Sequence, residues 1–263
     1  MKKVVVFVRT LVCSILAIVL LSSSTVVYAK SCEHSYGDTD VCKKCGNIRV
    51  HSFDYSIPFY TVKENVPIWS SPTKNSKLIE EVAEQDTEIA IDGILRNKYG
   101  NIWLKVASKN QYIFIDNLYI DFLVLSLRNF QQIFYYHDDF EIEIIEFCNF
   151  VKEKGRADYK AWLDPSSKGI EYKVRIGNDY YTMTAEELGN IHYGYLGRAV
   201  GIGANILLYA GGGVNVYGEV TQLPIDIVDI LNKCINSYCD DSADAENVKK
   251  GIDYFDTGTF KWE

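Results

Sequence analysis

Basic residues are scarce in this sequence relative to acidic ones. Lys and Arg number 27 against 35 Asp and Glu, which gives a formal net charge of −8. General coating of nucleic acid needs a strongly positive surface, so the charge balance argues against that class of protein. The hydrophobic share of 48% is ordinary for a chain that buries a core, and disorder over the whole length is not expected.

The sequence also lacks the short motifs of several common enzyme classes. It has no nucleophile box around a Ser or Cys, no His-Glu-x-x-His metal site and no glycine-rich phosphate loop. The Gly-x-Gly at Gly201 to Gly203 has neither a preceding strand nor a later acidic residue, so it is not a dinucleotide fingerprint. We therefore expect no catalytic cofactor.

The first 29 residues have the pattern of a secretory signal peptide. A positive start at Met1 to Lys3 precedes an apolar run from Val4 to Leu21, and Val27-Tyr28-Ala29 offers small residues at the −3 and −1 positions of a cleavage site. Cleavage would leave a secreted or cell-wall-associated chain that starts at Lys30, without a stable membrane anchor. An uncleaved anchor is the alternative, because the apolar run is about long enough to span a bilayer.

Residues 30–54 contain a cluster of metal-ligand type. Its spacing is Cys32-x-His34-x7-Cys42-x2-Cys45, and two thiols separated by two residues can grip one tetrahedral Zn²⁺ that the other two side chains complete. The cluster resembles a small zinc knuckle with a structural zinc. A disulfide is the competing interpretation, because exported chains are oxidised outside the cell.

Residues 55–122 read as a small all-β unit. Short alternating runs are separated by turn residues, which is typical of a small barrel. The expected strands are Tyr60–Val62, Val66–Trp69, Leu78–Val82, Glu88–Ile91, Ile102–Val106 and Tyr112–Ile115.

Two segments of this unit resemble a bacterial SH3-like (SH3b) domain. Pro67 to Pro72 stands at the place of the usual Asn-Val-Arg-x-x-Pro motif, and Asn101 to Val106 fits the usual Gly-x-x-Trp-x-Lys-Val strand. Pro67 and Trp69 depart from the pattern. The resemblance implies binding of cell-wall peptidoglycan, and a spacer or an intramolecular contact is the alternative.

Residues 123–263 are expected to form a mainly helical α+β domain. The predicted helices are 139–154, one that starts at Ala185–Leu188, Ala199–Tyr209, Leu223–Tyr238 and Ala245–Phe255, with a hairpin at Glu171–Ile176 and Asp179–Met183. The expected fold class is thus multidomain, an SH3-like barrel followed by this domain. Cys148, Cys234 and Cys239 are candidates for a disulfide whose pairing stays open.

A glycine-rich run from Gly189 to Gly201 stands out within this domain. It holds four glycines in thirteen residues. A packed helix has little use for them, since each costs roughly 0.5–1 kcal/mol against alanine, unless a backbone or a ligand must come close. We therefore expect something to approach the chain here.

Four pieces in chain order carry a family resemblance over roughly residues 150–258. They are the Asp-x-Lys box Asp158-Tyr159-Lys160, the box Gly189 to Gly194, the small pair Ala210-Gly211 and the acidic tail Asp240 to Asp244. Together they resemble the polymorphic toxin type 44 (bacterial toxin 44) family. The resemblance implies a toxin that hydrolyses RNA, with an immunity protein as a partner.

The resemblance also implies a set of site residues. Asp158 or His192 would take the proton of the attacking 2′-hydroxyl, and Lys160 would steady the charged phosphorane. The full candidate set is Asp158, Lys160, Asn190, His192, Asp241 and Asp244. Helix capping is the alternative role for the acids of the tail.

Cations outnumber anions locally around the Asp-x-Lys box. The cations are Lys152, Lys154, Arg156, Lys160, Lys168, Lys173 and Arg175, and the anions are Glu153, Asp158, Asp164 and Glu171. Seven against four leaves a local charge of +3, which could draw a phosphate to one cleft. Solvated helix ends and hairpin edges are the alternative interpretation.

Two other functions remain open. Cleavage of a cell-wall glycan, with Asp158 as general acid, is favoured by the leader and the SH3-like unit. A non-catalytic wall-binding or adhesion module is the third possibility, because no site is convincing from the residues alone.

Overall fold

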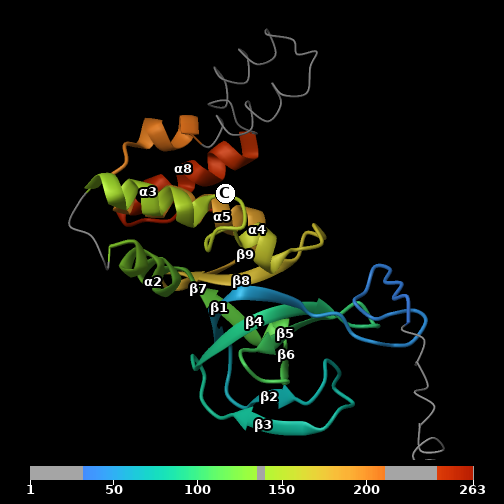
Figure 1. Ribbon diagram of the computed structural model, residues 1–263. Coiled ribbons are helices and arrows are strands. Elements are labelled where there is room, and N and C mark those ends of the chain that lie inside the picture. Colours follow the sequence, from blue (N-terminus) through green and yellow to red (C-terminus); the bar gives the residue numbers. More distant parts are fainter. Residues whose placement is uncertain (1–31, 135–139, 211–241, 263) are drawn as a thin grey trace, which may run out of the picture.

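The computed structural model describes residues 32–134, 140–210 and 242–262 (Figure 1). The expected signal peptide, Asp241 and the expected helix Leu223–Tyr238 lie outside the described residues. The strands are β1 (His51–Thr61), β2 (Val66–Trp69), β3 (Leu78–Val82), β4 (Glu88–Arg96), β5 (Ile102–Val106), β6 (Tyr112–Phe114), β7 (Leu118–Asp121), β8 (Glu171–Ile176) and β9 (Asp179–Thr184). A short 3-10 helix, η1 (Ile115–Asn117), leads into β7.

The expected strands are confirmed, and β2, β3 and β5 have the predicted bounds. The first strand is much longer than expected. Its pairing with β4 shifts register between Ser52 and Ile57, and this bulge interrupts the alternation of buried and exposed side chains that predicts a strand. Strand β7 was not predicted, because its four residues are all buried and show no alternation.

The strands form one open sheet in the order β3-β2-β6-β5-β4-β1-β7-β8-β9. A closed SH3-like barrel is therefore not confirmed. The reason is that β7 pairs with β1 on one side and in parallel with β8 on the other, through Ile120 opposite Val174. The sheet thus continues from the predicted all-β unit into the predicted C-terminal domain.

The helices gather at one end of the molecule, above β8 and β9 in Figure 1, while β2 to β6 lie at the other end. They are α2 (Phe122–Phe134), α3 (Phe140–Val151), α4 (Tyr159–Leu163), α5 (Ala185–Ala199) and α8 (Ser242–Thr257). Residues 204–210 are also helical. The helix expected from Ala199 begins there instead, because Gly201 takes a φ of 86° between the two helices.

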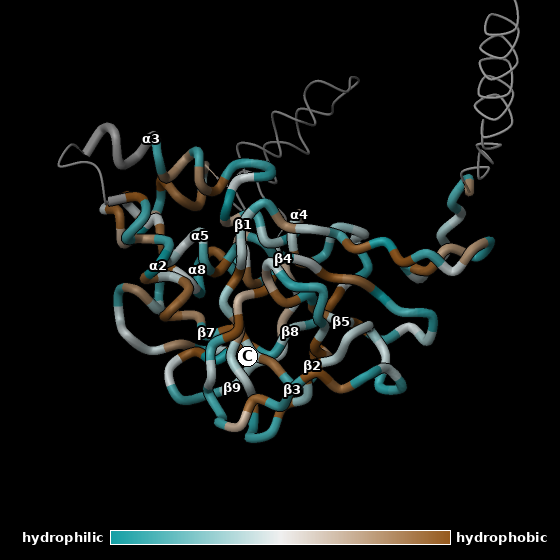
Figure 2. The backbone as a smooth tube through the Cα atoms, turned by 60° about the horizontal axis from the view of Figure 1, so that its bottom comes forward, coloured by the Kyte–Doolittle hydropathy of each residue, from teal (hydrophilic) through white to brown (hydrophobic). Residues whose placement is uncertain are grey.

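One hydrophobic core runs under both parts of the sheet. It joins side chains of the N-terminal strands, such as Phe59 and Ile113, to Tyr159, Val174 and Leu188 of the C-terminal part. In Figure 2, brown stretches along the central strands mark hydrophobic residues. A second, smaller core lies among the helices, around Leu196 and Val248. Within the described residues no helix is both long and apolar enough to cross a membrane.

The glycine-rich run is helical, and what approaches it is another helix. A Cβ added to Gly194 would clash with the carbonyl oxygen of Val248 in α8, and one added to Gly251 of α8 would clash with that of Ile191. The two backbones can therefore lie this close only because both helices carry glycine at the crossing. By contrast, Gly189 has no heavy atom within 4 Å of its Cβ position.

Candidate functional site

The Asp-x-Lys box lies at the start of helix α4. Asp158 is the N-cap residue, and its carboxylate accepts backbone hydrogen bonds from Ala161 at 3.2 Å and from Lys154 at 2.7 Å. The Asp-x-Lys box therefore starts a helix. Capping satisfies amide groups that the first turn of a helix leaves without partners.

Lys160 forms an ion pair with Glu186 in the first turn of α5. A hydrogen bond to Glu186 raises the pKa of Lys160 above its ordinary value, and the charges of Glu186, Asp244 and Asp158 add to the effect against desolvation. Lys160 is therefore a cation at any physiological pH. Glu186 was not predicted from the sequence, although the capping box formed by Thr184 and Glu187 fixes its place at the helix start.

Asn190 connects α5 to the acidic tail. Its side-chain amide donates a hydrogen bond to Asp244 Oδ1 at 2.7 Å. Asp244 lies in the first turn of α8, where a negative charge is favourable. Asn190 and Asp244 are far apart in the sequence, and the close crossing of α5 and α8 described above brings them together.

A cavity of about 450 Å³ brings these side chains together. Four of the six predicted residues line it, namely Asp158, Lys160, Asn190 and Asp244. Its other lining residues are Phe147, Cys148, Val151, Lys152, Glu153, Ala157, Tyr159, Ala185, Glu186, Gly189, Tyr193, Ala210 and Val248. We call it the carboxylate cavity.

The C-terminal part of the sequence is similar to a known protein family. Residues 146–257 match the family model described as Bacterial toxin 44. The match includes the whole Asp-x-Lys box, the glycine-rich run and Asp244, so this part of the chain is similar to polymorphic bacterial toxin domains. No curated protein and no solved structure matches the chain.

His192 lies in the same toxin-like region but away from the carboxylate cavity. The side chain is completely buried, and its ring packs against Phe122 and Tyr159. Nε2 lies 3.3 Å from the side-chain amide of Asn129, while Nδ1 has no hydrogen-bond partner among the described residues. Desolvation by burial lowers the pKa of His192 to about 3, so the ring is neutral.

The local excess of cations does not converge on one cleft. Lys152 and Lys160 line the carboxylate cavity, Arg156 lines a second cavity, and Lys168 reaches toward Asp38 of the N-terminal part. Arg175 pairs with Asp121 at 2.6 Å. These cations thus lie in different cavities and ion pairs, which favours the alternative interpretation of separate helix ends and hairpin edges.

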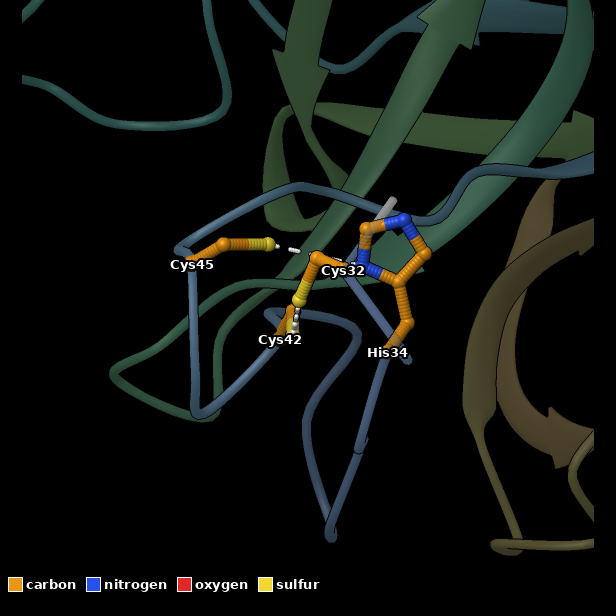
Figure 3. A group of neighbouring side chains, drawn as sticks. All are labelled: Cys32, His34, Cys42 and Cys45. Carbon is orange, nitrogen blue, oxygen red and sulfur yellow. Dashed lines mark hydrogen bonds between the residues drawn. The ribbon is translucent and has the colours of Figure 1, made fainter. Parts of the chain in front are cut away.

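The Cys/His cluster is the candidate metal centre (Figure 3). One ligand atom from each of Cys32, His34, Cys42 and Cys45 lies within 4.8 Å of the others. Cys32 Sγ and Cys42 Sγ are 3.9 Å apart, and Cys45 Sγ is 3.4 Å from His34 Nδ1. A tetrahedral zinc site requires about 3.8 Å between two sulfurs and about 3.5 Å between sulfur and nitrogen, so the group fits the ion.

These separations do not fit the disulfide interpretation. A disulfide needs sulfurs about 2.05 Å apart, and all three thiols of the cluster are free. Although desolvation acts in the opposite direction, hydrogen bonds from the Ser35 backbone and the His34 side chain lower the pKa of the Cys42 thiol to about 5, whereas a hydrogen bond with Cys45 and burial raise the pKa of Cys32 to about 11. The thiolate is the form that binds metal. Four protein ligands would make this a structural zinc, with no open position for catalysis.

Asp40 ties this cluster to the sheet. Its carboxylate accepts hydrogen bonds from the Arg96 backbone at 2.8 Å and from the Arg49 side chain at 2.8 Å. His51 at the start of β1 lies 2.8 Å from the same carboxylate. The loop that carries the metal ligands is thereby held against the end of β4.

Proposed function

We propose that the chain is an exported toxin whose C-terminal part hydrolyses RNA in the carboxylate cavity. The observation that carries this proposal is the convergence of Asp158, Lys160, Asn190 and Asp244 in one cavity, within the region that matches Bacterial toxin 44. They come from α4, α5 and α8, so the fold and not the local sequence gathers them. An acid, a cation and an amide that orients a second acid are the parts that metal-independent phosphodiester cleavage needs.

In this mechanism a carboxylate takes the proton of the attacking 2′-hydroxyl. Asp158 is the proposed base, because backbone amides fix its position at the rim of the cavity. Lys160 stabilises the charged phosphorane, and its raised pKa keeps it protonated. Asn190 orients Asp244, the second carboxylate. We assign buried His192 a packing role behind the site instead of proton transfer.

One observation favours a second candidate, cleavage of a cell-wall glycan. Two cations, Lys152 and Lys160, face four anions in the cavity lining: Glu153, Asp158, Glu186 and Asp244. A net negative lining opposes a polyanion and tolerates an uncharged sugar chain. Two carboxylates are also the usual equipment for glycoside hydrolysis, with Asp158 as the general acid.

The predicted SH3-like unit supplies the targeting part of the proposal. We propose that residues 55–122 direct the exported chain to cell-wall peptidoglycan. Sedimentation of the chain from Lys30 onward with purified peptidoglycan tests this. If the protein stays in the supernatant, the strands β1 to β7 serve the fold of the C-terminal part and not the wall.

Production in two compartments separates the two substrates. The chain from residue 30 onward is used whole, because β7 pairs with β8 and the core crosses between the two parts. An RNase stops growth when it is made in the cytoplasm, where RNA is, and total RNA from those cells is degraded. A wall hydrolase is harmless there and toxic when exported. Absence of toxicity in both compartments contradicts both enzyme proposals and favours the binding module.

A further inference from the structure

A second cavity lies between the first strand and the helices. It measures about 540 Å³, within the range of small-ligand sites. Residues of β1, α2 and α4 line it, together with Arg156. They are Tyr55, Ser56, Ile57, Pro58, Leu125, Arg128, Asn129, Gln131, Gln132, Arg156 and Tyr159. Tyr159 also lines the carboxylate cavity, so the two cavities share this residue.

The lining of this cavity has cations and amides but no carboxylate. Arg128 is neutralised by Glu88, to which it donates hydrogen bonds at 2.9 and 2.5 Å. Arg156 is half-buried, and among the described residues it has no acidic partner. Desolvation lowers the pKa of Arg156, a cost that an anionic ligand would offset. Arg156 is therefore a cation in the cavity lining that no carboxylate of the described residues neutralises.

The ring of Tyr55 fixes the guanidinium in place. Arg156 lies over this ring, with 5.0 Å between its Cζ and the ring centroid. Trp162 meets the Tyr55 ring edge-on at 6.3 Å. The bulge in β1 takes Tyr55 out of its ladder with β4 and turns the chain toward the cavity. A guanidinium that lies over an aromatic ring can still donate hydrogen bonds to a ligand.

We propose that this Arg156 cavity binds a phosphate-bearing ligand of nucleotide size. The fork of Arg156 takes the phosphate, since a planar guanidinium matches phosphate oxygens in a bidentate way. Tyr55 is 42% exposed, so the part of its ring that Arg156 and Trp162 leave uncovered offers a surface for a base, and the amides of Gln131 and Gln132 on α2 offer groups for the edge of the base. A free nucleotide and one unit of an RNA strand share this chemistry. The site does not depend on what the carboxylate cavity cleaves.

Binding is measured by isothermal titration of the full chain from residue 30 onward. The probes are inorganic phosphate, adenosine and uridine 5′-monophosphates, and a 2′-O-methyl trinucleotide, which lacks the hydroxyl that an RNase uses and so reports binding alone. We expect the nucleotide probes to bind more tightly than inorganic phosphate. If the trinucleotide binds more tightly than the monophosphates, the ligand of the cavity is part of an RNA strand. If the affinities are equal, the ligand is a free nucleotide.

Three variants decide whether Arg156 is responsible. Arg156→Met should weaken nucleotide binding by about 10- to 100-fold, and Arg156→Lys should weaken it less, because lysine keeps the charge without the fork. Gln132→Glu adds a negative charge at an exposed position of the rim and should also weaken binding without disturbing the packing. Lys109→Met is the matched control, because it removes one positive charge from the exposed loop between β5 and β6. Its affinity for the nucleotides should equal that of the unchanged chain.

The proposal is overturned if none of the probes binds, or if inorganic phosphate binds as tightly as the nucleotides. It is also overturned if nucleotide affinity is unchanged in both Arg156→Met and Gln132→Glu. Thermal unfolding of each variant accompanies the titrations. Should Arg156→Met fail to fold, the result for Gln132→Glu decides the question, because that side chain is exposed.

Discussion

The side-chain amide of Asn190 donates a hydrogen bond to Asp244 Oδ1 at 2.7 Å, although 54 positions separate the two residues in the chain. The bond lies where α5 crosses α8, next to the glycines that let the two backbones approach. It brings an acid of the C-terminal tail beside Asp158 and Lys160. The close helix crossing and the candidate site are therefore parts of one arrangement.

Asp158→Asn should abolish most of the toxin activity while it preserves the fold. Asparagine caps a helix about as well as aspartate, so α4 can keep the N-cap bond from Ala161, while the bond from Lys154 to the second oxygen is lost together with the charge and the proton acceptor. Loss of a general base costs roughly 10²- to 10⁴-fold in rate. The measurement is RNA cleavage by the purified chain, with circular dichroism as the check on folding.

Asp158→Ala is the companion variant that separates capping from chemistry. It should lower the free energy of unfolding by about 1 kcal/mol, since alanine cannot accept the bonds from Ala161 and Lys154. If Asp158→Asn is folded and fully active, capping is the whole role of Asp158 and the proposed base is wrong.

Gly251→Ala should destabilise the protein strongly, whereas Gly189→Ala should not. The added methyl group at position 251 meets the Ile191 carbonyl in the neighbouring helix, and overpacking of this kind costs about 1–3 kcal/mol or more. At Gly189 the Cβ position is open, so alanine should stabilise α5 by about 0.5–1 kcal/mol. Urea unfolding measures both. Equal stability of the two variants would contradict the tight crossing of α5 and α8.

Local patterns were enough to predict most elements of the fold. Alternating strands such as Leu78–Val82 and the hairpin of β8 and β9 follow from the periodicity and turn residues of their own segments. The parallel pairing of β7 with β8 cannot be predicted in this way. It joins Ile120 to Val174, and neither short segment has a sequence pattern that indicates a distant partner. That one pairing turns the expected closed barrel into an open sheet.

The candidate site was partly predictable for a similar reason. The Asp-x-Lys box, Asn190 and Asp244 were found through a family pattern, which records residues and not their distances. Glu186 and the Arg156 cavity were missed because their neighbours come from distant parts of the chain. His192 was selected for its chemistry, and only packing against Phe122 and Tyr159 reveals that it is buried.

Purified chain should contain one zinc ion, and Cys45→Ser should lose it. The substitution removes one of four ligands whose spacing fits a tetrahedral ion. Cys148→Ser is the matched control, because that free and exposed thiol lies outside the cluster. Metal analysis is run beside intact mass under non-reducing conditions. Absence of zinc together with a mass lower by two protons per cysteine pair would show a disulfide instead.

His192 should make the protein less stable as the pH falls below neutral. Burial lowers its folded pKa to about 3, while the unfolded chain has the ordinary value of about 6.5. Between these values the unfolded state binds a proton that the folded state does not, so the free energy of unfolding decreases as pH decreases. The slope is about 1.4 kcal/mol per pH unit, and the contribution between about pH 7 and about pH 5 is roughly 2 kcal/mol.

The variant His192→Asn tests this contribution, because it removes the titrating ring and keeps a hydrogen-bonding group beside Asn129. The variant loses packing with Phe122 and Tyr159 at every pH, so its stability is lower throughout. The quantity to compare is the change in the free energy of unfolding between the two pH values, which urea unfolding gives for both proteins. Between about pH 7 and about pH 5, the free energy of unfolding should fall by roughly 2 kcal/mol more in the original chain than in the variant. Equal losses in the two proteins would mean that His192 titrates near its ordinary pKa, and a group that does so is accessible enough to return as a candidate for proton transfer.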